Sequence, residues 1–362
     1  MISNQIMQNT IEGIKAIARV ELFVADIDGK LVASTKTIGN SFENSVLEFV
    51  KSAADSQEIQ GCQFFKIYDD QQLEYILIAN DAGENAYMVG KMAAFQLQNL
   101  MVAYKERFDK DNFIKNLLLD NLLLVDIYSR SKKLHIQTDV KRAVLIVESQ
   151  NGKDANILEK VRENFGQNGR DFVTAVDENN VIVVKEIADN ETNRDIDKYA
   201  RAIEESLVKD GIKDVHISYG TNVKEIKEVS RSYKEAKMAL DVGKIFFAER
   251  DIIAYSELGI GRLIYQLPIP LCKMFIKEIF GGKSPDDFDD ETLITINKFF
   301  ENSLNVSETS RQLFIHRNTL VYRLDKLQKS TGLDLRIFED AITFKIALMV
   351  VRYMKYMESF EY

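Results

Sequence analysis

The residues from Asn305 to Leu327 constrain the fold of this chain more than any other stretch. Asn305 is a favourable helix N-cap, and the Glu308 carboxylate three positions later can reach back to the first amide. A break follows around Ile315 and His316, where a second amphipathic segment begins. The stretch therefore predicts two short helices joined by a tight turn, a helix-turn-helix.

The second of these helices is expected to have one apolar face and one basic face. Leu320, Leu324 and Leu327 recur at helical spacing and predict a buried stripe. Residues 316–329 hold four cations and one acid, whereas the whole chain has 47 Lys and Arg against 56 Asp and Glu, for a net charge of -9. The side chains predicted to face outward are Arg317, Asn318, Thr319, Tyr322, Arg323 and Lys326.

These residue types suit DNA recognition. A helix-turn-helix places the start of its second helix in the major groove, where Arg can bind guanine and Asn can pair with adenine. We predict base contacts from Arg317 and Asn318 with Thr319 close by, and phosphate or docking contacts from Tyr322, Arg323 and Lys326. Ser307 and His316 complete the predicted set. An ordinary helical hairpin with a solvated cationic face is the alternative.

The sequence LFIHRNTLVYRLDKLQKSTGLDL, at residues 313–335, resembles a known family. It is similar to the C-terminal helix-turn-helix of the sugar-diacid regulator (CdaR) and purine-catabolism regulator (PucR) family of bacterial transcription factors. The HRNTL.YRL core is long and specific. The resemblance implies that the chain reads double-stranded operator DNA.

Length and composition limit the remaining possibilities. A chain of 362 residues with 46% hydrophobic residues predicts two or three domains with ample core. The acidic total argues against nonspecific binding of nucleic acid over the whole surface, so any contact must be local. Neither a signal peptide nor an apolar run of about 18 residues is apparent, so we expect a soluble, cytoplasmic protein without membrane contact.

The cysteines and histidines indicate no metal, cofactor or disulfide. Cys62 and Cys272 are far apart in the sequence and favour reduced thiols. His135, His216 and His316 occur singly, without ligand spacing between them.

The N-terminal residues predict a sensor domain. A helix over 4–17 precedes a hairpin of residues 20–26 and 30–35 around the turn at Asp28 and Gly29. A helix over 42–54 and strands over 63–68 and 73–80 follow. One small sheet with helices beside it suggests a PAS- or Cache-like sensor with its pocket between sheet and helices.

The loop after the hairpin resembles, more weakly, the diacid-recognition domain of the CdaR family. There the family has an Arg and a His suited to carboxylates. Thr37 and Phe42 occupy those positions here, so we expect the domain to be retained with a changed ligand; the alternative is that these loop residues merely pack. The predicted ligand-binding residues are Thr37, Gly39, Asn40, Phe42, Phe64 and Lys66.

Two helical runs follow, over 84–109 and 113–133. The first could be a core helix or a dimer seam, and we favour a signal-carrying helix. Neither run has clean heptads. From residue 142 the pattern becomes βαββαβ, which predicts a ferredoxin-like sheet with helices on one face.

This middle part resembles the GGDEF-like domain of the same family, at Ser232 to Lys237 and Val242 to Lys244. Active diguanylate cyclases need a Gly-Gly-acid-Glu-Phe hairpin. The predicted hairpin tip is instead Asp177-Glu178-Asn179-Asn180, which indicates a degenerate domain rather than an enzyme.

The predicted fold is α+β and multidomain. It comprises a PAS/Cache-like sensor with helical connector at 1–136, a degenerate GGDEF-like ferredoxin-type domain at 137–256, a helical linker at 257–290 and an all-α helix-turn-helix domain at 291–362. In that last domain helices are expected over 291–303 and 342–357.

The leading hypothesis is a homodimeric, ligand-responsive transcription factor for a carbohydrate or organic-acid operon. A small organic acid or sugar-derived effector would bind the N-terminal domain and alter DNA binding. A nucleotide-binding or diguanylate-cyclase-like enzyme acting through residues 138–256 is the rival, and a protein-binding adaptor is a third possibility.

Overall fold

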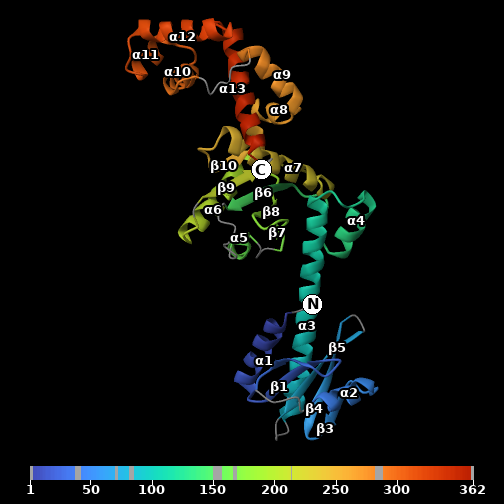
Figure 1. Cartoon of the computed structure of the whole chain (residues 1–362). Coiled ribbons are helices and arrows are strands. Elements are labelled where there is room, and N and C mark those ends of the chain that lie inside the picture. The colour runs from blue at the N-terminus through green and yellow to red at the C-terminus, as the bar shows by residue number, and fades with distance from the viewer. Residues whose placement is uncertain are drawn as a thin grey trace. The chain divides into compact units, whose positions relative to one another are not determined.

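The computed structural model describes residues 3–36, 42–69, 72–80, 85–149, 157–165, 169–212, 214–281 and 288–359. The chain divides into two compact units, Met1–Ile114 and Lys115–Tyr362. Each unit contains one five-stranded sheet, and the helices follow the order shown in Figure 1. The fold is α+β, as predicted.

The sheet of the first unit is antiparallel, with strand order β2-β1-β5-β4-β3. The predicted hairpin forms around Gly29, whose φ of 87° requires glycine, and the Asp26 carboxylate accepts hydrogen bonds from the amides of Asp28 and Lys30. The strands are β1 (Glu21–Asp26), β2 (Leu31–Ser34), β3 (Ser56–Ile59), β4 (Cys62–Asp69) and β5 (Gln72–Asn80). Of these, β3 was not predicted.

Helices cover both faces of this sheet. Successive side chains of β1 point to opposite faces of the sheet. Val24 packs with α1 (Asn4–Ala18) and α3 (Asn85–Leu118) on one face, and Phe23 packs with α2 (Glu43–Lys51) on the other. The predicted break between residues 109 and 113 was wrong, because α3 continues to Leu118. No proline or glycine stands in that interval to interrupt the helix.

The sheet of the second unit has strand order β10-β9-β6-β8-β7. The four predicted strands lie side by side, and β10 adds a parallel neighbour to β9 that was not predicted. The strands are β6 (Arg142–Ser149), β7 (Phe172–Ala175), β8 (Asn180–Glu186), β9 (Val215–Tyr219) and β10 (Ile252–Ala254).

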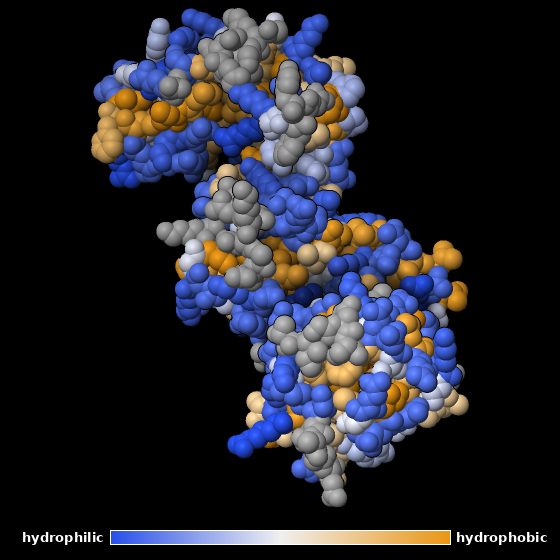
Figure 2. All heavy atoms as spheres, turned by 60° about the horizontal axis from the view of Figure 1, so that its bottom comes forward, coloured by the Kyte–Doolittle hydropathy of each residue, from blue (hydrophilic) through white to orange (hydrophobic). Residues whose placement is uncertain are grey.

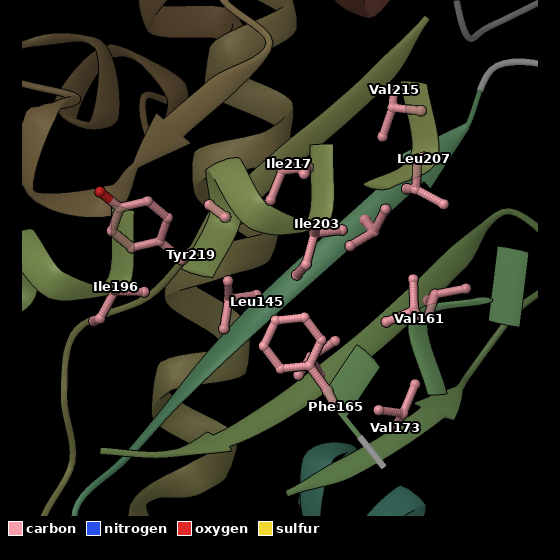
Figure 3. Packing of buried hydrophobic residues seen from close by; sticks show 14 of the residues in the cluster. Leu145, Val161, Phe165, Val173, Ile196, Ile203, Leu207, Val215, Ile217 and Tyr219 are labelled. Carbon is pink, nitrogen blue, oxygen red and sulfur yellow. The ribbon is translucent and has the colours of Figure 1, made fainter. Parts of the chain in front are cut away.

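The expectation that helices cover only one face of this sheet was wrong. Helices α5 (Ile157–Phe165) and α6 (Asn193–Lys209) pack over one face, in the cluster shown in Figure 3. Helix α7 (Val229–Phe246) packs on β6 and β9 from the other side, where Ser232 Oγ accepts from the Val144 amide at 3.0 Å. Gly220 permits this approach, since a Cβ there would lie 2.1 Å from the Ser232 carbonyl oxygen.

The C-terminal helices build two hydrophobic cores that share α13 (Phe338–Glu358). Val350, Tyr353 and Met354 pack with α7, α8 (Gly261–Tyr265) and α9 (Ile269–Phe280). Phe344 and Ala347 pack instead with α10 (Asp290–Glu301) and α12 (Arg317–Thr331). The helical linker predicted over 257–290 contributes Leu258, Ile264 and Phe280 to these cores.

Two helices complete the second unit, α4 (Leu124–Lys133) and α11 (Val306–Gln312). The surface combines broad hydrophilic areas with hydrophobic patches (Figure 2). Within the described ranges, no helix has the length and apolar character needed to cross a bilayer.

Candidate nucleic-acid interface

Side-chain caps define where the two helices of the helix-turn-helix begin. Asn305 Oδ1 accepts from the Glu308 amide at 3.0 Å and starts α11, as predicted. The Asn305 amide donates to the Asn302 carbonyl rather than to the Glu308 carboxylate. The Glu308 carboxylate accepts instead from Arg311 Nη2 at 2.6 Å and Gln312 Nε2 at 2.8 Å. At α12, His316 Nδ1 accepts from the Asn318 amide at 3.2 Å.

The apolar face of α12 fixes the orientation of the helix. Leu320, Leu324 and Leu327 are buried, which confirms the predicted stripe, and they pack with residues of α10 and α13. The opposite face is exposed at Arg317, Asn318, Thr319, Tyr322 and Lys326, with Ser307 and His316 also exposed. Within the described part of the chain, Arg317 has no ion-pair partner, so its guanidinium can reach an external acceptor.

Arg323 departs from the predicted outward orientation. Its side chain is 16% exposed, Nη1 donates to Thr295 Oγ1 at 2.9 Å, and Nη2 pairs with the Glu291 carboxylate. The sequence-based orientation was wrong because α10 lies against this part of α12 and supplies two acceptors. Arg323 therefore joins α10 to α12.

Other charges near α12 are partly neutralised by neighbours. Lys326 Nζ lies 3.8 Å from the Asp289 carboxylate, and both side chains remain largely exposed. Hydrogen bonds from Thr292 hold the pKa of Asp289 below its usual value, and Lys326 and Arg323 act in the same direction. Lys326 keeps its charge available at the surface because the contact is long and solvated.

The predicted ligand-binding residues of the first unit are only partly described. Thr37, Gly39 and Asn40 lie outside the described residues. The Phe64 ring is buried between Phe42, at a centroid distance of 6.3 Å, and Phe49, at 5.8 Å.

Lys66 has partners inside the fold as well. Its Nζ donates to the Ser52 carbonyl and lies 5.3 Å from the centroid of Phe49. Phe64 and Lys66 thus both lie against Phe49 of α2, and Phe42 packs on Phe64.

The β7–β8 turn has the geometry of an ordinary tight turn. Asp177 Oδ1 accepts from the amides of Asn179 and Asn180, at 3.0 and 2.8 Å. The carboxylate is folded back onto its own turn. Among the described residues, no group of three His, Cys, Asp or Glu side chains is arranged to hold a metal ion.

The capped turn, the buried leucine stripe and the exposed first turn of α12 define a helix-turn-helix of the DNA-binding class. Residues 292–350 match the sequence family described as PucR C-terminal helix-turn-helix domain, and residues 121–242 match the GGDEF-like domain family. The chain belongs to the PucR/CdaR family of transcriptional regulators, and its helix-turn-helix implies DNA binding.

Several curated relatives are similar over different lengths. The purine catabolism regulatory protein of Bacillus subtilis is 27% identical over 38% of this chain and 26% of its own length. The carbohydrate diacid regulator of Escherichia coli is 24% identical over 74% of this chain and 72% of its own length. The proline-responsive transcriptional activator PutR of Bacillus subtilis is 23% identical over 92% of this chain and 84% of its own length. The match thus spans about a quarter of the first relative and most of the other two.

Proposed function

We propose that this regulator is ligand-responsive, and that a small molecule bound by its N-terminal unit alters operator binding by the helix-turn-helix. The observation that carries the proposal is the exposed first turn of α12, with Arg317, Asn318 and Thr319 in solvent above a buried leucine stripe. Arg317 and Asn318 are the proposed base contacts. Ser307, His316, Tyr322 and Lys326 are proposed to contact phosphate or set the docking angle.

The Arg317→Ala variant tests the base contact. The probe is a duplex selected from a random pool by the wild-type protein, because no operator is known in advance. We expect operator binding to weaken by about 1–3 kcal/mol at fixed salt, with specificity relaxed at one base position. Affinity is measured by gel shift or fluorescence anisotropy.

The Arg170→Ala variant is the matched control for this test. It removes the same side chain from a site that is 75% exposed in the GGDEF-like part of the chain. Its affinity should equal that of the wild type. Unchanged affinity in Arg317→Ala, at several salt concentrations, would contradict the proposed contact.

The first unit is proposed to be a PAS- or Cache-like sensor, and a small carbohydrate or organic acid is the proposed effector class. The five-stranded antiparallel sheet with helices on both faces supports this assignment. Two relatives are named for carbohydrate diacids and for proline, so metabolite-sized effectors suit the family. The regulated operon is correspondingly proposed to be one of carbohydrate or organic-acid metabolism.

The regulator is further proposed to act as a homodimer. A single helix-turn-helix contacts little DNA, and two copies on paired half-sites supply the missing specificity. An apolar stripe on α3 supports this proposal, since Met88, Met92 and Phe95 are each about two-thirds exposed.

A further inference from the structure

Phe314 has an unusual environment in the turn between α11 and α12. Its side chain is 95% exposed, more than any other large hydrophobic side chain in the described part of the chain. An aromatic ring left in water contributes nothing to the hydrophobic core. The folded protein by itself therefore gives no stabilising reason for phenylalanine at this position.

The backbone at Phe314 is also unfavourable for this residue type. Its φ is 53°, in the left-handed region where glycine is accommodated without a steric cost. The conformation is imposed by the turn, because the Phe314 amide donates to the Arg311 carbonyl at 3.2 Å and the Ile315 amide to the Ser310 carbonyl at 3.0 Å. A glycine would satisfy the same turn with less strain.

The neighbouring residues hold Phe314 in a defined place. Leu313 and Ile315 are partly buried against the core that contains Leu320 and Phe344, so they fix the turn on both sides of the exposed ring. His316, which caps α12, lies two residues further on, and Arg317 follows it. The exposed ring consequently lies immediately before the first turn of the recognition helix.

We propose that Phe314 is an apolar DNA contact that packs against a thymine methyl group or a deoxyribose at the edge of the major groove. It acts beside the bases contacted by Arg317 and Asn318, and the inference therefore rests on the proposed function. Apolar side chains recognise the thymine methyl by this kind of contact. Binding removes the ring from water, which gives it a stabilising role that the free protein lacks.

The Phe314→Gly variant separates DNA contact from a structural role. Glycine relieves the left-handed backbone, and this relief offsets its greater freedom in the unfolded chain, so the Tm should stay at or above that of the wild type. Affinity for the wild-type-selected duplex should fall about tenfold, since an apolar contact is lost. Phe314→Leu should retain most of the affinity.

The matched control is Phe338→Ala, which removes a ring that is 65% exposed at the first turn of α13. It should bind as the wild type does. Replacing thymines in the duplex by deoxyuridine distinguishes the two apolar partners. If the wild type binds the deoxyuridine duplex more weakly and Phe314→Gly loses no further affinity, the partner is the methyl group. If the wild type binds both duplexes equally, the partner is the sugar.

Wild-type affinity in Phe314→Gly, together with a loss in Arg317→Ala, would overturn this inference and leave the proposed function standing. Failure of the wild-type protein to select any duplex would overturn both.

Discussion

Arg317 and Arg323 lie on the same helix, yet their guanidinium groups have different surroundings. Arg317 is exposed at the first turn, whereas Arg323 is 16% exposed and bound to Glu291 and Thr295 of α10. Both residues are cations on the predicted outward face of an amphipathic helix. The contact between α10 and α12, rather than the helical period, leaves Arg317 exposed for the proposed DNA contact and uses Arg323 to hold α12 against α10.

Replacement of Arg323 by alanine is expected to destabilise the helix-turn-helix. The change leaves Glu291 and Thr295 without their guanidinium partner and should lower the free energy of unfolding by about 1–2 kcal/mol. Urea denaturation followed by circular dichroism measures the change. Lys329→Ala, at an exposed position in the last turn of α12, should leave stability within about 0.5 kcal/mol of the wild type.

Stability in Arg323→Ala equal to that of the wild type, with DNA binding nevertheless lost, would assign this residue to direct contact with DNA. That outcome would contradict the positioning role inferred from its contacts with α10.

At the level of elements, α3 has two apolar faces. Ala93, Leu97 and Met101 are buried against the sheet of the first unit. Met88, Met92, Phe95 and Val102 face solvent with exposures of 56–67%, and Asn99 is exposed between them. These outward residues, which we call the α3 stripe, recur at alternating intervals of four and three, the spacing of a coiled-coil seam.

The two faces explain why no heptad pattern was recognised in the sequence. Apolar residues of the inward face fall between those of the α3 stripe, so the combined pattern has no single period. Burial in the three-dimensional structure separates the two sets. An Asn within such a seam is a known means of fixing register in a two-stranded coiled coil.

Phe95→Glu tests the α3 stripe as the dimer seam. Two like charges would face each other across a seam, so the variant should be monomeric by sedimentation and should bind the selected duplex more weakly. The first unit should stay folded, because Phe95 is 67% exposed.

The control is Gln96→Glu, which adds the same charge at an exposed neighbour outside the α3 stripe. It should remain dimeric. A Phe95→Glu protein with the same sedimentation behaviour as the wild type would require a different dimer interface.

At the level of the whole molecule, the described cores show which parts of the second unit share their stability. Helix α13 contributes Val350 and Tyr353 to the core that it shares with α7, α8 and α9, and Phe344 to the core of the helix-turn-helix. The Tyr265 hydroxyl donates to Asp241 of α7 at 2.9 Å, which further ties α8 to the GGDEF-like part. A change in the packing of α13 would therefore alter the packing of both cores.

Effector binding and operator binding should be coupled thermodynamically. A small sugar or organic acid that raises the Tm should change affinity for the selected duplex, and the duplex should change affinity for that compound by the same factor. Calorimetry with and without DNA measures both. Compounds that leave the Tm unchanged serve as controls, and a compound that binds without altering DNA affinity would contradict ligand responsiveness.

The sequence by itself determined the features that depend on neighbouring residues. The Asn305 cap, the leucine stripe of α12, the hairpin at Gly29 and all strands except β3 and β10 follow from local hydrogen bonds and from hydrophobic periodicity. The resemblance at residues 313–335 also identified the family that the comparisons support.

Only the tertiary structure decided which surface each element meets. The inward turn of Arg323, the packing of α7 on the second face of its sheet, and the separation of the two faces of α3 depend on contacts between residues distant in the sequence. The physical reason is that periodicity identifies a face suited to burial, but its partner is set by long-range packing. The exposure of the Phe314 ring was likewise decided by the tertiary structure, because sequence alone does not distinguish a buried phenylalanine in a turn from one in solvent.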